Sequence, residues 1–225
     1  AVTSAFTHPH ILPLLDSGET VDRLGRSCPY YVMPLIAGDS LEDRLLQERR
    51  LPIRDAVRLT REILEAIRYA HEHHVIHRDI KPANILLSDG HAVVADFGVA
   101  RPKPGSVREQ QGGKSITEFG FIVGTPEYMS PEQALGDERV DERCDLYAVG
   151  CVLYEMIVGT PPFEGPTAQM IVSRKISGAF APITAKRTGV PLELDEILTK
   201  ALRAEPSDRY ASAAEFLEDL SRLDV

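Results

Sequence analysis

The sequence is poor in cysteine, lacks tryptophan and contains no long hydrophobic run. Its three cysteines, Cys28, Cys144 and Cys151, show no C-x-x-C spacing, which argues against a disulfide framework and indicates reduced thiols in a reducing compartment. Because no stretch of about 18 apolar residues occurs, no segment of the sequence is expected to cross a membrane. Basic residues are outnumbered, 25 against 34 acidic ones, and the net charge of −9 argues against sequence-independent nucleic-acid binding.

The chain is nevertheless long and apolar enough to fold: 43% of its 225 residues are hydrophobic, which suits the core of one domain. Strand patterns and helix patterns are segregated along it, so an α+β arrangement is favoured over a doubly wound α/β sheet. The Gly- and Pro-containing segment 101–124 is expected to be a long functional loop. The expected strands are 11–15, 30–36, 85–87 and 92–95. One helix is expected to start after the N-cap Ser40, and a second one to run from about residue 53 to residue 74. Further helices are expected at 141–158, 167–177, 192–203 and 212–222.

Polar residues are concentrated in the stretch IHRDIKPANIL, residues 76–86, and in the tripeptide DFG that follows the expected strand 92–95. Asn84 and Asp96 would lie at the two ends of a tight strand pair, where their oxygens can face one another across one site. Amide and carboxylate oxygens suit Mg²⁺, which takes only one or two protein ligands when phosphates complete its shell. The pattern therefore predicts a magnesium and phosphate site.

Two further residues of this stretch fit phosphate chemistry. Asp79 lies on the loop before the strand pair, where its carboxylate can accept the proton of a hydroxyl group. Lys81 can offset negative charge on a phosphoryl group that moves toward that hydroxyl. Phosphoryl transfer requires positioning and charge stabilisation from a protein, and these two groups can supply both.

Three segments, HRDIKPAN (77–84), DFG (96–98) and GTPEYMSPE (124–132), together resemble the catalytic loop, metal-binding motif and activation-segment end of eukaryotic-type protein kinases. The phrases HPHILPLLDSGE and GTPEYMSPEQ are similar to the bacterial serine/threonine kinases of this type. The resemblance covers the whole chain. It implies a protein-kinase-like α+β fold, mainly the α-helical C-terminal lobe at 37–225. Residues 1–36 would be a remnant of the N-terminal lobe, namely a helix end, two strands and the start of the hinge.

The resemblance implies a catalytic role for five residues. Asp79 would be the catalytic base, and Lys81 would contact the γ-phosphate of ATP. Asn84 and Asp96 would hold Mg²⁺. Thr125, in the Gly-Thr-Pro turn, together with Lys81, is typical of kinases that act on Ser and Thr.

Four residues would form the adenine site by the same resemblance. Met33 would be the gatekeeper, and Leu86 would lie under the adenine ring. Pro34 departs from the acidic residue usual at its position, but a proline keeps its carbonyl group, which is all that the adenine amino group needs. The N–H group of Ile36 would serve a ring nitrogen.

Regulation by loop phosphorylation is also implied, because Arg78 precedes the catalytic base. The candidate phosphorylation sites are Thr117, eight residues before Thr125, and Ser115. A phosphate there could pair with Arg78 and order the loop. Phe119 stands where related bacterial kinases often carry a second threonine, which puts control by two threonines in doubt.

Five residues have structural roles in the family that this chain resembles. His77 and Phe97 would stack in the regulatory hydrophobic spine. Glu132 and Arg209 would form an ion pair. Asp145 would brace the backbone of the catalytic loop.

The sequence lacks three features that a kinase of this type needs: no G-x-G-x-x-G occurs, and neither the strand lysine nor the helix glutamate that holds the nucleotide is found. The chain is therefore expected to be a fragment of a serine/threonine kinase. The alternative is a catalytically inactive, pseudokinase-like interaction module; a kinase for small molecules is disfavoured by the GTPEYMSPE segment. The expected cofactors are ATP and Mg²⁺. The expected partners are proteins with Ser or Thr, including other copies by self-phosphorylation in trans, and no nucleic acid. The expected location is the cytoplasm, with a membrane anchor beyond Val225 left open.

Overall fold

The computed structural model describes residues 7–23, 25–97, 125–137 and 139–224. The candidate phosphorylation sites Ser115 and Thr117 lie outside these ranges. The described strands are β1 (Asp16–Val21), β2 (Ser27–Val32), β3 (Ile85–Ser88) and β4 (His91–Val94). The described helices are α1 (Leu41–Glu48), α2 (Ile53–Glu72), the 3-10 helix η2 (Pro82–Asn84), α3 (Pro131–Leu135), α4 (Arg143–Val158), α5 (Ala168–Ser177), α6 (Ile183–Lys186), α7 (Leu192–Ala201), the 3-10 helix η4 (Pro206–Asp208) and α8 (Ala213–Ser221).

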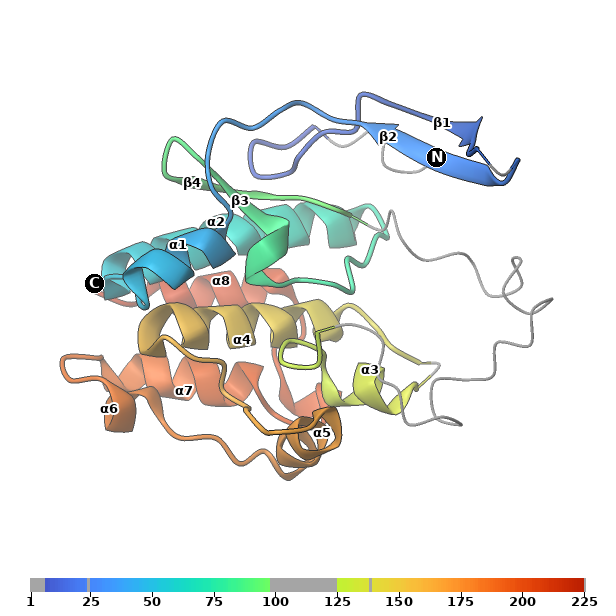
Figure 1. The fold of residues 1–225 in the computed structure, drawn as a ribbon. Helices are drawn as coiled ribbons and strands as arrows, with labels where there is room; N and C mark the ends of the chain where they lie inside the picture. The colour runs from blue at the N-terminus through green and yellow to red at the C-terminus, as the bar shows by residue number, and fades with distance from the viewer. Residues whose placement is uncertain (1–6, 24, 98–124, 138, 225) are drawn as a thin grey trace.

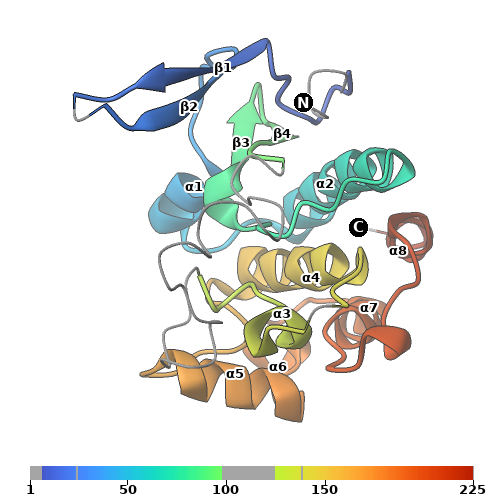
Figure 2. The same ribbon diagram turned by 90° about the vertical axis from the view of Figure 1, so that its right-hand side faces the viewer.

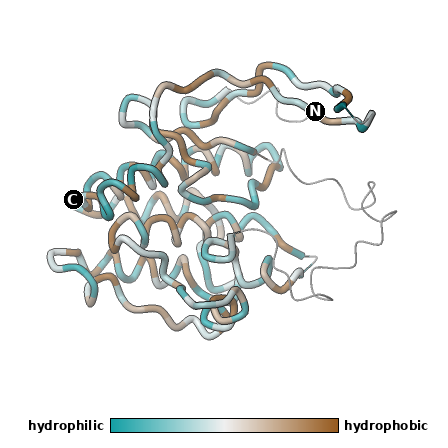
Figure 3. The backbone as a smooth tube through the Cα atoms, viewed as in Figure 1, coloured by the Kyte–Doolittle hydropathy of each residue, from teal (hydrophilic) through white to brown (hydrophobic). Residues whose placement is uncertain are grey.

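The elements form three levels in space. The antiparallel hairpin β1–β2 lies at one end of the molecule, and the antiparallel pair β3–β4 lies between this hairpin and the helices (Figures 1 and 2). Helices α2 and α4 pack against each other in the middle of the helical body, with α8 against α2 and α7 against α4. Apolar residues line the helices of this body (Figure 3), so that one core joins α1, α2, α4 and the pair β3–β4.

Of the expected strands, 11–15 was wrong and 30–36 was confirmed only at 30–32, because the hairpin pairs Asp16–Val21 with Ser27–Val32. Only the start of the apolar run 11–15 reaches the core: Ile11 is buried and bridges Val94 in parallel, and the Leu12 N–H donates to the Val94 carbonyl at 2.9 Å, whereas Leu15 is 63% exposed. Burial of the Ile11 side chain therefore fixes where this segment begins. The adjacent polar residues are then free to pair as a hairpin.

The start of α1 agrees with the expectation from Ser40. Its hydroxyl accepts a hydrogen bond from the Asp43 N–H while the Asp43 carboxylate accepts from the Ser40 N–H, a complete capping box. Just before it, Gly38 approaches β3 so closely that a Cβ atom there would lie 2.0 Å from the Leu87 carbonyl oxygen. A side chain at position 38 is therefore excluded, and the chain can only enter α1 through a glycine.

Helix α4 is apolar on nearly all sides, and most of its residues are buried. A helix of this kind belongs in the centre of a helical body, where every face meets another element. It ends at Gly159, whose φ of 93° provides the left-handed cap that stops the helix. Among the described residues, even so, no helix combines the length and the apolar character needed to cross a membrane.

Candidate active site

The loop after α2 is braced by one buried carboxylate. Asp145, in the first turn of α4, accepts hydrogen bonds from the backbone N–H groups of His77 at 2.8 Å and Arg78 at 2.7 Å. The His71 Nε2 atom, at the end of α2, lies 2.9 Å from the same carboxylate. Arg78 itself has a φ of 68°, a left-handed conformation that a non-glycine residue adopts only where its surroundings enforce it. Asp145 thus fixes the sharp turn that precedes Asp79.

The charge of this carboxylate follows from its surroundings. Burial would raise the pKa of Asp145, but the hydrogen bonds from His71 and the loop backbone, with the nearby imidazole of His77, lower this pKa overall. Asp145 is therefore ionised when it holds the loop. His71 was missed as a functional residue because the sequence indicated only its place near a helix end, and nothing local pointed to a partner 74 residues away.

His77 connects the loop to the residues that follow β4. Its Nδ1 atom accepts a hydrogen bond from the Asp79 N–H at 3.2 Å, so the Nε2 atom carries the proton and donates to the Ala95 carbonyl at 2.8 Å. Its ring also meets the Phe97 ring edge-on, with ring centroids 4.7 Å apart. This is the contact implied by the resemblance, while the regulatory role of the pair stays a prediction.

Three of the predicted catalytic residues meet directly. Lys81 Nζ lies 2.9 Å from Asp79 Oδ2, and Asn84 Nδ2 donates to that same oxygen at 3.0 Å and to the Asp79 carbonyl at 2.8 Å. The side chain of Asp79 is 54% exposed, so a ligand can reach it, whereas Asn84 is buried. Two donors hold the Asp79 carboxylate in one orientation, as a positioned proton acceptor requires.

Asp96 reaches the same region through the backbone. The Ala95 N–H donates to the Asn84 carbonyl at 2.9 Å, which places Asp96 next to Asn84 across the end of the pair β3–β4. Asp96 has a φ of 62° and is exposed. Because the Asn84 amide nitrogen is directed at Asp79, the Asn84 Oδ1 atom is left without a partner among the described residues. The backbone thus brings an amide side chain and a carboxylate side chain, whose oxygens suit a hard cation, to the same end of the pair β3–β4.

The predicted adenine-site residues lie on two neighbouring segments. Met33, Pro34 and Ile36 are in the link between β2 and α1, and Leu86 is on β3 and forms a bridge with Ser40 at the end of that link. Neither the Pro34 carbonyl nor the Ile36 N–H group pairs with another described residue. These two backbone groups are therefore open to a ligand, and they are the pair that the resemblance assigns to adenine.

Thr125 opens a segment that is tied to the loop and to α4. The Tyr128 N–H donates to the Thr125 carbonyl at 3.3 Å, and the Tyr128 hydroxyl donates to the Glu155 carboxylate at 2.6 Å. Burial and the nearby Glu155 raise the pKa of Tyr128, so its hydroxyl keeps its proton. From α3, the Gln133 amide donates to the Arg78 carbonyl at 2.9 Å. Sequence reasoning missed Glu155 and Gln133, because their partners are distant in sequence.

The predicted ion pair is present and buried. Arg209 donates through both terminal nitrogens to the two carboxylate oxygens of Glu132, at 2.8 and 2.7 Å. Burial would raise the pKa of Glu132, but the bonds from Arg209 lower it below its usual value. Arg209 also donates to the carbonyls of Arg203 and Ala204. The pair joins α3 to the segment before α8.

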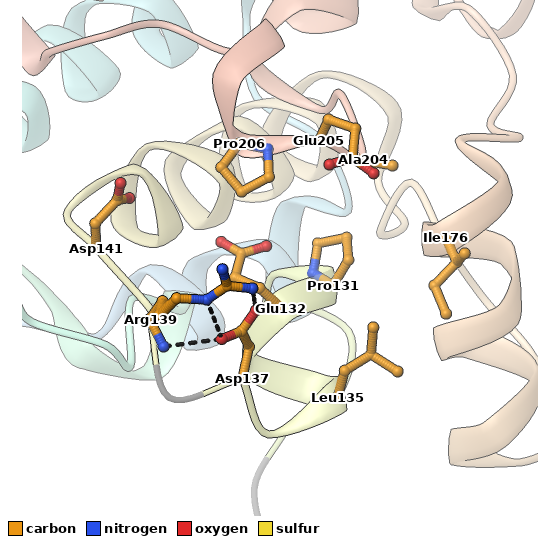
Figure 4. A pocket seen from close by; sticks show the side chains of 10 residues that line it. All are labelled: Pro131, Glu132, Leu135, Asp137, Arg139, Asp141, Ile176, Ala204, Glu205 and Pro206. Atoms are coloured by element: carbon orange, nitrogen blue, oxygen red, sulfur yellow. Dashed lines mark hydrogen bonds and ion pairs between the residues drawn. The ribbon is translucent and has the colours of Figure 1, made fainter.

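A groove lies between α3, α5 and η4, and its lining includes Glu132 and Ala204 from the region of the ion pair (Figure 4). Its walls include Leu135 and Ile176, and its rim carries Asp137, which is hydrogen-bonded to Arg139. None of the catalytic-loop residues lines it. This groove is therefore not the candidate active site.

The protein kinase domain family matches residues 1–220, and the chain belongs to this family. The expected kinase-type α+β fold is thereby confirmed. The chain is 37% identical over 221 residues to the serine/threonine-protein kinase PknB of Mycobacterium leprae, with 98% of this chain and 34% of the relative covered. It is 38% identical over 221 residues to PknB of Mycobacterium tuberculosis, with 98% and 34% covered. It is 40% identical over 222 residues to the probable serine/threonine-protein kinase PknB of Bifidobacterium longum, with 95% and 31% covered. The chain spans about a third of the length of these relatives, and the resemblance to bacterial serine/threonine kinases is confirmed.

Proposed function

We propose that this chain contributes the catalytic loop and the substrate platform of a protein kinase that transfers the γ-phosphate of ATP to Ser and Thr hydroxyls. The observation that carries the proposal is the Asp79 carboxylate, which is held by Lys81 and Asn84 on a loop that Asp145 braces. A carboxylate in one orientation can accept the proton of an incoming hydroxyl. The names of the relatives support Ser and Thr as acceptors.

The residues present fit ATP and Mg²⁺. Asn84 and Asp96 would hold the cation through an amide oxygen and a carboxylate, the small protein share that Mg²⁺ takes beside phosphates. When bound, Mg²⁺ neutralises charge on the phosphates of the nucleotide. Lys81 would stabilise the γ-phosphate, and the link that contains Pro34 and Ile36 would hold the adenine.

We propose the domain division 1–36 for the remnant of the N-terminal lobe and 37–225 for the C-terminal lobe. The exposed position of β1–β2 beside a buried helical body supports this division. Since no G-x-G-x-x-G occurs in the sequence, the groups that clamp the phosphates would come from sequence outside this chain. The intact mass of the protein made in its host tests this point. A mass above 24.8 kDa supports it, whereas a mass of 24.8 kDa favours the inactive interaction module.

We propose further that the kinase activity is controlled by phosphorylation of this chain. The Arg78 side chain is exposed next to the catalytic residues, where a phosphate on Thr117 or Ser115 could pair with it. With Thr117 or Ser115 as the acceptor, one copy of the protein would phosphorylate another copy in trans. Mass spectrometry of the protein before and after incubation with ATP would locate the phosphate, and modification of neither residue would exclude this control.

The central experiment replaces Asp79 with Asn in the protein as its host makes it. We expect phosphorylation of dephosphorylated casein to fall about 10²–10⁴-fold, because the amide cannot accept the proton. The matched control is Asp89→Asn, which makes the same chemical change at the exposed turn between β3 and β4 and should leave the rate unchanged. Equal rates for Asp79→Asn and the unchanged protein would refute the proposed chemistry.

A further inference from the structure

Helix α5 carries a lysine whose side chain is completely buried. Lys175 lies in its last turn with 0% exposure, and it is among the largest fully buried side chains of the described residues. Its Nζ atom faces the rings of Tyr147 and Phe163, with centroids at 4.9 and 5.0 Å, and the Cys151 sulfur lies 4.0 Å away. Lysine is almost never fully buried without a charged partner, so this position calls for an explanation.

No carboxylate in the described part of the chain forms an ion pair with Lys175. Its Nζ atom donates to the backbone carbonyl of Glu127, at 2.7 Å, and makes a long, weak hydrogen bond to the Cys151 sulfur, at 4.0 Å. Burial lowers the pKa of Lys175, since the ammonium group is removed from water. Two aromatic faces offset part of that cost by cation–π attraction. For stability alone, an apolar side chain such as methionine would serve this site as well as or better than lysine.

The carbonyl that Lys175 holds belongs to the segment 125–130. Glu127 is two residues from Thr125, inside the turn that the Tyr128 N–H closes onto the Thr125 carbonyl. Tyr128 is fixed from α4 by Glu155, at 2.6 Å. Lys175 fixes the same turn from α5. Two helices therefore hold the turn. Helix α4 binds the Tyr128 side chain, and helix α5 binds the Glu127 backbone carbonyl.

We propose that Lys175 is a positioning residue, which holds the Glu127 carbonyl so that the segment 125–130 keeps the shape that receives a protein substrate. This inference rests on the proposed kinase function. We expect Lys175 to affect the protein substrate and not the nucleotide, because α3 and α5 lie at the opposite end of the molecule from the hairpin β1–β2 that leads into the link that contains Pro34 and Ile36 (Figures 1 and 2). Nothing near position 175 in the sequence points to this role, since the partner carbonyl is 48 residues away.

The test uses Lys175→Met, which removes the ammonium group and keeps an unbranched side chain in the cavity. The matched control is Lys186→Met, the same change at an exposed position at the end of α6. We expect the KM for dephosphorylated casein to rise about tenfold in Lys175→Met, the range of one hydrogen bond from a charged donor. The KM for ATP and the midpoint of urea unfolding should stay within experimental error of the unchanged protein, or the midpoint should rise.

A second readout needs no kinase activity. Hydrogen–deuterium exchange should become about tenfold faster in the amides of residues 127–130 in Lys175→Met, and stay unchanged in α4 and in Lys186→Met. If the unchanged protein fails to phosphorylate casein, the proposed function fails while the exchange still tests Lys175. Unchanged exchange in 127–130 overturns the inference. So does an equal loss in both KM values with a lowered unfolding midpoint, because Lys175 would then be merely structural.

Discussion

The two hairpins of this molecule are both antiparallel, yet they lie in opposite environments. The strands of β1–β2 have six residues each, and nearly all of these are exposed. The strands of β3–β4 have four residues each, and most of these are buried or half-buried. The shorter pair is the better covered one, with α2 against β4 and α1 against β3. An isolated two-stranded hairpin is marginal in water, so tertiary cover and not strand length sets the stability of each pair.

The candidate active site lies on the covered hairpin. Asn84 directly precedes β3, and Asp96 follows the end of β4. A side chain that must hold a cation or a proton acceptor needs a rigid support, and buried strands provide one. The exposed hairpin, which bears Val21 and Tyr30 on open surface, carries none of the predicted catalytic residues. Packing of the helices against β3–β4, rather than the hairpin itself, therefore positions the catalytic side chains.

The largest effect on this comparison is expected from Ile85→Ala. Ile85 is fully buried in β3, one residue after Asn84. Truncation should lower the free energy of unfolding by about 2–5 kcal/mol, since it removes buried methyl groups and leaves a cavity. Urea unfolding followed by circular dichroism would measure it. A cost below about 1 kcal/mol would show that β3 is not supported by its packing.

A smaller effect is expected from Glu62→Gln, which loosens the cover of β4. The Glu62 carboxylate, in α2, accepts the Ala92 N–H at 2.7 Å, lies 2.8 Å from His91 Nδ1 and pairs with Arg58 at 2.9 Å. The amide keeps the shape but loses charge-assisted bonds, so the free energy of unfolding should fall by about 1–3 kcal/mol at pH 7. Equal unfolding midpoints for both proteins would contradict this role.

The difference in stability between the unchanged protein and Glu62→Gln should depend on pH, because it comes from the Glu62 carboxylate. Burial would raise the pKa of Glu62, but the bonds from Ala92, His91 and Arg58 lower this pKa overall. A lowered folded pKa adds stability that is fully present above the ordinary glutamate value of about 4.3 and is lost as pH falls through the folded pKa. The stability gap between the unchanged protein and Glu62→Gln should therefore shrink as pH falls below about 4. A gap that widens in acid would reverse the assignment.

The sequence predicted the covered parts of the fold better than the exposed ones. The cap at Ser40, the helix after Pro52 and the pair β3–β4 were found, because apolar periodicity and capping chemistry act together there. The strand Asp16–Val21 was missed, since both of its faces are open and no alternation of apolar residues marks it. The short helices α3 and α6 were also missed, at five and four residues, because a single turn has too few positions to show a period.

The residues of the candidate site also differ in how well the sequence predicted them. Asp79, Lys81 and Asn84 could be predicted because they lie within six residues of one another, where loop geometry forces contact. His71, Glu155 and Lys175 could not, since each acts on a partner brought near only by the packing of α2, α4 and α5. Local motifs predict the groups that would react. Of the groups that orient them, Asp145 was expected from the family resemblance, whereas His71, Glu155 and Lys175 appear only in the tertiary fold.

The sharpest test of the comparison makes one substitution in each hairpin, and the smallest effect of all is expected in the exposed one. Val21, in β1, is 68% exposed, while Val94, in β4, is fully buried beside Ile11. Val21→Ala should change the free energy of unfolding by no more than about 0.5 kcal/mol. Val94→Ala removes the same two methyl groups and should cost about 1.5–3 kcal/mol. Urea unfolding of both variants measures the effect of tertiary cover on the free energy of unfolding, because the residue type, the substitution and the antiparallel setting are identical. Equal costs would mean that the open face of β1–β2 is covered in the natural protein, and the contrast between the hairpins would then be lost.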